Sequence, residues 1–397
     1  MTRTELAVEK YDKYVMKTYP KADILFVKGS GCKLWDGEGR EYLDFSSGIA
    51  VCSLGHANET IAEAVAEQAR TLVHVSNLYM NEKQCALAEK LIKHGFDGTC
   101  FFCNSGAEAN EALIKLARKW GNERGKNEII TMEDSFHGRT LATLAATGRA
   151  KYRKGFGPDV QGFSQVPFND FEALKNAVRE KTAAVLMEPV QGEGGIIPAD
   201  PAYLKAVREF CNEKGILLLF DEVQCGTGRT GTLFAWQNYG IEPDALSMAK
   251  AIGNGFPLGC MIAQRKYSDV LTPGTHASTF GGTALACAAG CCVVDLLCEG
   301  GVLENCRKQG EYLMKRLTPM IEKYPFVKDV RGKGLMIGIE LTFAPSAEVL
   351  PALREKGLIA LPAGETVLRL VPPLVVTEGE CEKAVQIIES VFAAIKA

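Results

Sequence analysis

The sequence predicts an α/β protein with a large domain built on a mostly parallel sheet between helices and a smaller α+β domain. Three short apolar runs with little alternation are typical of strands covered on both faces, and they end in Glu188, Asp221 and Lys250. These residues lie 33 and 29 positions apart, the spacing of consecutive β-α-β units. At 397 residues the chain exceeds the usual size of one core, so we expect two domains.

The N-terminal segment, 1–55, is predicted to contribute to the small domain. Its stretch 29–44 is rich in turn residues and predicts a small antiparallel hairpin. Alternating strand and helix patterns then run through the large domain, 56–295. Within this domain, a helix at 201–215 starts after Asp200 and stops at Gly215.

The C-terminal small domain, 296–397, restarts after two consecutive glycines. Its patterns predict, in order, a helix near 302–324, a strand within 332–341, a strand at 366–370 and a closing helix from Glu378. This mixture of helices and strands is typical of an α+β lobe.

The overall composition is that of an ordinary globular protein. A formal charge of −3 lacks the basic excess that nucleic-acid phosphates require, so no nucleic-acid partner is expected. The chain begins with charged residues, and its longest apolar run, 284–294, is far shorter than a membrane span, so no membrane partner is expected either. The fourteen cysteines are scattered through apolar stretches, which favours reduced thiols and a cytoplasmic protein.

Several motif matches lack the context that would give them a function. The glycine pattern of residues 226–231 fits dinucleotide sites, but it does not lie between a strand and a helix start. Residues 247–250 fit a serine-lysine motif whose partner motifs are missing. Cys100 and Cys103 have zinc spacing without a second pair, and no two histidines have a helical metal spacing, so no metal site is predicted.

The remaining polar residues form a set that suits pyridoxal phosphate. Residues 104–107 follow a strand and open a helix, whose free N–H groups favour a phosphate dianion, although Ser105 is equally suited to be a helix cap. Lys250 could form a Schiff base with an aldehyde, because burial favours the neutral amine. Asp221 could pair with a pyridinium nitrogen, which would offset the cost of burying its carboxylate.

The chain resembles the class III (ornithine-type) pyridoxal-phosphate aminotransferases over nearly its whole length. The resemblance implies the type I fold of pyridoxal-phosphate-dependent transferases, with a mostly parallel seven-stranded sheet between helices in the large domain. It rests on ordered motifs, all of which are present: LWDG (34–37), YLDF (42–45), LGH (54–56), NSGAEANE (104–111), EPVQGEGG (188–195), FDEVQCGTGRTG (220–231), AKAIGNGFPLG (249–259) and TFGG (279–282).

The resemblance also implies how the cofactor is bound. Lys250 would hold it covalently and shuttle protons, and Asp221 would contact the pyridine nitrogen. Phe136 would stack on the ring. Thr279 would reach the phosphate of the partner subunit's cofactor, which implies a homodimer with active sites at the subunit interface. The remaining contacts would come from Ser105, Gly106 and Ala107 around the phosphate, Val223 against the ring and Gln224 near the phenolic oxygen.

Three stretches are similar to the branch of the family that acts on N-acetylornithine: GIAV (48–51), SFHGRT (135–140) and HASTFGG (276–282). By this resemblance, Arg139 and Ser278 would hold N-acetylornithine. Arg369 would clamp the α-carboxylate of glutamate or 2-oxoglutarate, a task suited to a guanidinium. Glu193 would pair with Arg369 while the amino donor is bound and swing away for the dicarboxylate.

The implied reaction moves the δ-amino group of N-acetylornithine to 2-oxoglutarate, giving N-acetylglutamate 5-semialdehyde and glutamate in arginine biosynthesis. Related terminal amines remain open as substrates: N-succinylornithine, ornithine, 4-aminobutyrate and N-succinyl-diaminopimelate. Aminomutase or decarboxylase chemistry also remains open on the same fold, and a requirement for an external 2-oxo acid would separate these reactions from transamination.

Overall fold

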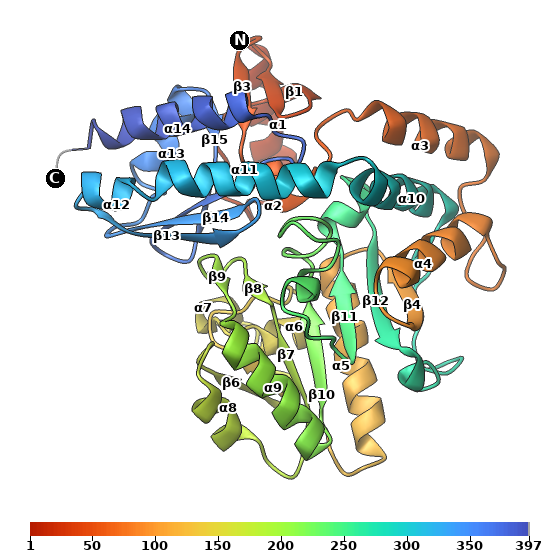
Figure 1. Ribbon diagram of the computed structural model, residues 1–397. Coiled ribbons are helices and arrows are strands. Elements are labelled where there is room, and N and C mark those ends of the chain that lie inside the picture. Colours follow the sequence, from red (N-terminus) through yellow and green to blue (C-terminus); the bar gives the residue numbers. More distant parts are fainter. Residues whose placement is uncertain (396–397) are drawn as a thin grey trace.

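The computed structural model describes residues 1–395 and has a seven-stranded sheet at its centre (Figure 1). β10 pairs in parallel with β7 and β11, whereas β12 is antiparallel to both of its neighbours. The predicted α/β class with a mostly parallel sheet is therefore confirmed. The strand order is β4 (Gly98–Cys103), β12 (Gly259–Gln264), β11 (Ala245–Met248), β10 (Leu217–Asp221), β7 (Thr182–Met187), β5 (Glu128–Met132) and β6 (Phe163–Val166).

Helices cover both faces of this sheet because its central strands are apolar on both sides. Every residue of β7 and β10 is buried, which accounts for their unalternating sequences. Val185 and Met187 of β7 pack in one core with α9 (Pro201–Lys214). Leu186 points the opposite way and packs in a second core with α5 (Gly106–Asn122).

The predicted helix at 201–215 is confirmed as α9. The Asp200 carboxylate caps its start by accepting hydrogen bonds from two backbone N–H groups, and Gly215 ends it with a left-handed φ of 56°. The other elements of this part are α3 (Glu59–Thr71), α4 (Glu82–His94), α6 (Leu141–Ala146), α7 (Ala150–Arg153), β8 (Val190–Gln191), β9 (Ile197–Pro198), α8 (Phe171–Ala177), α10 (Ala284–Glu299) and the 3₁₀ turns η1 (Ala235–Asn238), η2 (Lys250–Gly253) and η3 (Arg265–Tyr267).

The N-terminal segment contains three antiparallel strands where a single hairpin was predicted. Two left-handed glycines, Gly31 and Gly39, make the two turns. The short strand β15 (Leu358–Ile359) from the C-terminal part then joins this sheet in parallel. The elements are α1 (Arg3–Tyr14), β1 (Phe26–Ser30), β2 (Lys33–Asp36), β3 (Glu41–Asp44) and α2 (Ser47–Ala50).

The C-terminal part differs from the prediction in two places. The helix expected near 302–324 breaks into two because Pro319 cannot continue it. The strand expected within 332–341 is one arm of a hairpin that turns at Gly334. α11 and α14 pack on each other beside the N-terminal strands (Figure 1). The elements are α11 (Val302–Leu317), α12 (Met320–Lys323), β13 (Val327–Lys333), β14 (Met336–Leu341), α13 (Val349–Glu355), β16 (Leu361–Ala363), β17 (Val367–Leu370) and α14 (Glu378–Phe392).

The glycine-rich loop 226–231 joins the central sheet to these other parts. Its Arg229 is fully buried and donates hydrogen bonds to the carbonyl oxygens of Leu335 and Pro372 and to the Ser53 hydroxyl. Within residues 1–395 no carboxylate lies within ion-pair distance of this guanidinium, and burial lowers the pKa of Arg229 to about 10. One buried cation therefore holds three distant segments together.

No single helix within residues 1–395 combines the length and apolar character needed to cross a membrane. Within these residues, that length and composition are reached only by joining α10 to the stretch Val302–Lys323, which comprises α11 and α12. The chain bends by 64° between the two.

We predict that Gly334→Ala destabilises the fold more than Gly240→Ala. Both glycines have left-handed backbones, with φ of 57° and 64°, so both substitutions incur a strain of about 1–2 kcal/mol. A Cβ at Gly334 would also lie 2.7 Å from the backbone carbonyl carbon of Thr230, whereas nothing lies within 4 Å of a Cβ at Gly240. The clash should cost roughly 1–3 kcal/mol more. Thermal unfolding of the two variants measures this difference, and equal losses of stability would contradict the close approach.

Candidate active site

A cavity of about 410 Å³ opens where β7, β10 and β11 end. Glu188, Asp221 and Lys250 all line it, as the strand spacing led us to expect. Eight further residues singled out in the sequence line the same cavity: Ser105, Gly106, Ala107, Phe136, Arg139, Glu193, Val223 and Gln224.

One corner of the cavity is the start of α5. The first N–H groups of a helix have no partner within the helix, and those of Gly106 and Ala107 lie at the cavity wall. A Cβ at Gly106 would lie 2.7 Å from a methyl carbon of Val223, so only glycine fits there. The Ser105 hydroxyl caps the helix by accepting a hydrogen bond from the N–H of Glu108 at 3.2 Å. This corner suits a dianion such as a phosphate.

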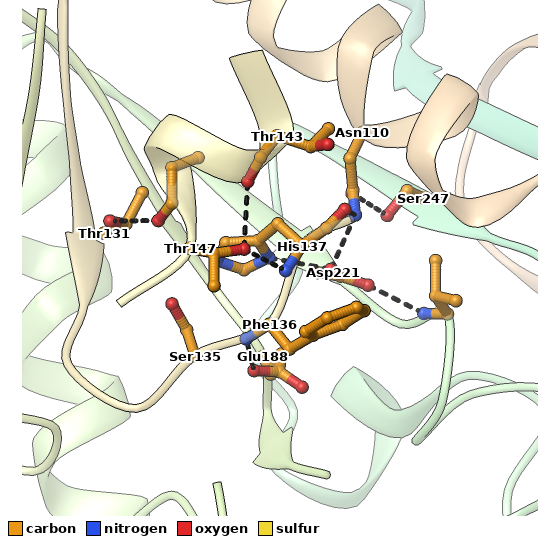
Figure 2. A network of polar contacts seen from close by, with 12 residues as sticks. Asn110, Thr131, Ser135, Phe136, His137, Thr143, Thr147, Glu188, Asp221 and Ser247 are labelled. Atoms are coloured by element: carbon orange, nitrogen blue, oxygen red, sulfur yellow. Dashed lines mark hydrogen bonds and ion pairs between the residues drawn. The ribbon is translucent and has the colours of Figure 1, made fainter. Parts of the chain in front are cut away.

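The Asp221 carboxylate is the centre of a buried polar network (Figure 2). Its Oδ2 accepts a hydrogen bond from Asn110 Nδ2 at 2.7 Å and lies 2.8 Å from His137 Nδ1. Its Oδ1 accepts from the N–H of Val223 at 3.0 Å. Because an ionised carboxylate can only accept, His137 carries a proton on Nδ1. Asn110 in turn accepts from the Ser247 hydroxyl at 2.6 Å.

Asn110, His137 and Ser247 were not predicted as site residues from the sequence. Asn110 lies on the buried, otherwise apolar face of α5, and a buried amide needs a partner. That signal was available, since Asn110 falls inside the NSGAEANE motif. His137 directly follows Phe136, but nothing local indicates that its imidazole reaches a residue 84 positions away.

Glu188 links two walls of the cavity. It is buried, and its two carboxylate oxygens accept hydrogen bonds from the N–H of Phe136 at 3.2 Å and from the N–H of Gly192 at 3.1 Å. Burial, and then the neighbouring Asp221 charge, raise the pKa of Glu188 to about 7. Glu188 thus holds the backbone of Phe136, a contact that Figure 2 shows, and the turn that carries Glu193.

Lys250 lies in η2, directly after β11, with an unusual left-handed φ of 51°. Burial lowers the pKa of its amine from the usual value, which favours the neutral form that can act as a nucleophile or accept a proton. The site therefore combines an anion corner, a buried carboxylate and a buried amine. This donor set fits pyridoxal phosphate, which carries a phosphate, a ring nitrogen and an aldehyde.

Two arginines near the cavity differ in whether their guanidinium has a polar partner. Arg369 is buried, and its Nη1 lies 2.5 Å from Glu193 Oε1 and 2.9 Å from Gln224 Oε1. Burial acts to raise the pKa of Glu193, but the Arg369 charge outweighs it and holds that pKa below its usual value. Arg139 is exposed at the cavity wall, and within residues 1–395 it has no hydrogen-bond or ion-pair partner. One guanidinium is occupied and the other is free.

Three of the predicted site residues do not line the cavity within one chain: Ser278, Thr279 and Arg369. Ser278 accepts hydrogen bonds from Asn104 Nδ2 at 3.2 Å and from the N–H of Gly281 at 3.0 Å. Thr279 is exposed on the same loop. Arg369 contacts the cavity indirectly, through Glu193 and Gln224.

Residues 14–392 match the family model described as Aminotransferase class-III. The acetylornithine aminotransferase of Caldanaerobacter subterraneus subsp. tengcongensis is 49% identical over 97% of this chain and 98% of its own length. That of Methanocaldococcus jannaschii is 47% identical over 97% of both chains. Among solved structures, an ornithine aminotransferase from Toxoplasma gondii with partial occupancy of pyridoxal phosphate has a TM-score of 0.95 and 31% identity, covering 99% of this chain and 94% of its own. The N-acetylornithine aminotransferase of Stenotrophomonas maltophilia has a TM-score of 0.84 and 35% identity, covering 98% of both chains.

We predict that Glu222→Gln makes stability less dependent on pH. Glu222 is fully buried, and its carboxylate accepts hydrogen bonds from the N–H groups of Ala235 and Trp236 at 2.6 and 2.8 Å. Burial raises the pKa of Glu222 from 4.5 to about 8. The stability that its protonated form contributes is therefore complete below about pH 4.5 and is lost as the pH rises toward 8, by up to ~1.4 kcal/mol per pH unit.

The check is thermal unfolding of wild type and the variant at pH 5.5, 6.5 and 7.5. As the pH rises, the Tm of wild type should fall relative to the Tm of Glu222→Gln. Parallel profiles for the two proteins would contradict the raised pKa.

Proposed function

Because the chain belongs to the class III aminotransferases, we propose that it moves the δ-amino group of N-acetylornithine to 2-oxoglutarate. The protein is a pyridoxal-phosphate-dependent transaminase of the type I fold. The products of the proposed reaction are N-acetylglutamate 5-semialdehyde and glutamate, as in arginine biosynthesis. The observation that carries this choice of substrates is the contrast between the free Arg139 and the occupied Arg369.

The cofactor-binding roles follow from the donor set of the cavity. The N–H groups of Gly106 and Ala107 would hold the phosphate beside Ser105, and Asp221 would hold the ring nitrogen protonated. Phe136 and Val223 would pack against the ring, with Gln224 near its phenolic oxygen. When bound, pyridoxal phosphate supplies an electron-withdrawing ring that stabilises negative charge on the reacting carbon.

Lys250 would hold the cofactor aldehyde covalently until the substrate amine replaces it. The Lys250 Nζ, whose pKa burial lowers, would then accept a proton from the δ-carbon of N-acetylornithine. Asn110 and His137 hold the Asp221 carboxylate in place through their hydrogen bonds to its Oδ2. Each of these residues acts on a proton or a charge at a defined atom.

The two arginines would sort the two substrates. N-Acetylornithine carries one carboxylate, which the unpartnered Arg139 and Ser278 would bind while Glu193 keeps Arg369 neutralised. 2-Oxoglutarate carries two carboxylates. Its α-carboxylate would bind Arg369 once the Glu193 side chain has rotated away from that guanidinium. The glycines on either side of Glu193 permit that movement.

We also propose a homodimer in which Thr279 reaches the phosphate of the partner subunit's cofactor. The loop that carries Thr279 adjoins the segment 74–81, because Asn77 Nδ2 donates to the carbonyl oxygens of Ser278 and Gly281. Together they expose a contiguous group of large apolar side chains, which a second copy would cover. The group consists of Leu78, Tyr79, Met80 and Phe280. A cytoplasmic location is proposed as well, since all fourteen cysteines within residues 1–395 are free thiols.

The substrate is tested by titrating the purified, cofactor-loaded protein with candidate amines and following the visible absorption of the bound cofactor. We expect N-acetylornithine to convert the spectrum at the lowest concentration and 2-oxoglutarate to restore it. Parallel titrations would use N-succinylornithine, ornithine, 4-aminobutyrate and N-succinyl-diaminopimelate. Preference for one of these would replace the substrate, and conversion that 2-oxoglutarate cannot reverse would contradict transamination.

Glu193→Gln should raise the affinity for dicarboxylates. The amide cannot neutralise Arg369, so glutamate and 2-oxoglutarate no longer have to displace a charged partner. We expect their KM to fall roughly tenfold while the KM for N-acetylornithine changes little. Glu172→Gln, which alters an exposed surface pair, is the matched control. An unchanged KM for both dicarboxylates would contradict the gating role.

Subunit complementation tests the shared site. Lys250→Ala removes the cofactor lysine, and Thr279→Asp places a negative charge beside the phosphate that Thr279 would contact, so each homodimer should be inactive. Co-expression gives heterodimers in which one site has both wild-type residues, so roughly a quarter of wild-type activity should return. If Thr279 served its own subunit's cofactor, co-expression would restore nothing. A monomer in analytical ultracentrifugation would also contradict the proposal.

A further inference from the structure

Arg139 has a long, exposed side chain at the cavity wall, and no polar group of residues 1–395 holds it in place. The Arg139 guanidinium instead lies over two aromatic rings. The guanidinium carbon lies 4.0 Å from the ring centroid of Tyr152 and 5.4 Å from that of Phe136. An arginine over an aromatic face is attracted by the negative charge of the ring face, and this attraction leaves its N–H groups free for an anion.

Tyr152 is suited to hold a cation in place. It belongs to α7, and its ring stands at 90° to the Phe136 ring with 5.9 Å between the centroids. The segment around it is anchored on both sides, since Arg149 lies 3.3 Å from Asp134 and Arg153 donates to the carbonyl oxygen of Thr147 at 2.7 Å. The Tyr152 ring therefore offers a fixed surface.

The ring, rather than the hydroxyl, is the part of Tyr152 that makes these contacts. Within the described chain the hydroxyl has no hydrogen-bond partner, whereas the ring face or edge meets three cations. Besides Arg139, these are Arg149 at 5.9 Å and Lys151 at 5.7 Å from the centroid. Arg149 and Lys151 already pair with the carboxylates of Asp134 and Glu365, so within residues 1–395 Arg139 is the one cation of the three that is left for an incoming carboxylate.

We propose that Tyr152 is a positioning residue that holds Arg139 ready for the carboxylate of the amino donor. This inference rests on the proposed function. It assigns Tyr152 to both half-reactions, because glutamate and 2-oxoglutarate, with the α-carboxylate on Arg369 of β17, carry a second carboxylate remote from the reacting carbon that would reach Arg139. The donors selected are those with a carboxylate at the end remote from the reacting amine. Preorganising Arg139 lowers the entropy lost when that carboxylate binds.

The experiment compares Tyr152→Leu with Tyr152→Phe in the cofactor-loaded enzyme. Leucine removes the aromatic face, whereas phenylalanine keeps it and removes only the hydroxyl. We expect Tyr152→Leu to raise the KM for N-acetylornithine and the KM for glutamate in the reverse direction roughly five- to tenfold each, and to leave kcat near the wild-type value. Tyr152→Phe should retain wild-type values for both substrates.

A binding measurement separates positioning from catalysis. N-Acetylnorvaline has the carboxylate and acetyl group of N-acetylornithine but no terminal amine, so it can bind without reacting. Calorimetric titration should give a Kd that rises in Tyr152→Leu by the same factor as the KM, with an unchanged visible spectrum of the bound cofactor.

Three results would overturn the inference. Tyr152→Leu could leave both KM values unchanged, or lower kcat as strongly as it raises the KM values, or Tyr152→Phe could be impaired as much as Tyr152→Leu, which would assign the effect to the hydroxyl. Each of these is distinct from failure of the proposed function, in which the wild-type enzyme itself would not turn over N-acetylornithine.

Discussion

The buried carboxylate of Asp221 is the constraint on which the rest of the site depends. An ionised carboxylate in an apolar core is costly unless donors surround it. Here the donors come from separate elements, with Asn110 on α5 and His137 on the loop after β5. Both elements must lie at the end of β10 for the charge to be tolerated. The same arrangement brings the start of α5 and the Phe136 ring to the cavity wall.

The second organising feature is the pairing of charges around the substrates. Of the two guanidinium groups predicted to bind the substrates, those of Arg139 and Arg369, only that of Arg369 has a carboxylate partner within residues 1–395. A fixed positive charge at both ends would favour a dicarboxylate at every step. In the proposed reaction, neutralising Arg369 with Glu193 would let a single cavity accept a monocarboxylate amine and a dicarboxylate in turn.

The scaffold and the centre of the site could be predicted from the sequence. The spacing of the strands indicated that Glu188, Asp221 and Lys250 lie at one edge of the sheet, and all three line the cavity there. The β13 arm of the hairpin was missed because its sequence, VKDVRGK, is largely polar and contains no apolar run. Asn110 and His137 were missed because their partner, Asp221, is 111 and 84 residues away, and buried polar contacts of that range leave no local pattern. Thr279 could be identified only through the family resemblance, since an exposed threonine carries no signal of its own.

The buried Arg229 has a kinetic consequence. Its hydrogen bonds tie the loop after Asp221 to the N-terminal segment and to the two C-terminal segments around Leu335 and Pro372. Any hinge rotation between these parts would pull the guanidinium away from its carbonyl partners and leave an unpaired charge in an apolar interior. A rotation of the Glu193 side chain breaks none of these bonds. The proposed exchange of donor for acceptor would therefore not depend on domain closure, the motion that limits many enzymes to microseconds or milliseconds.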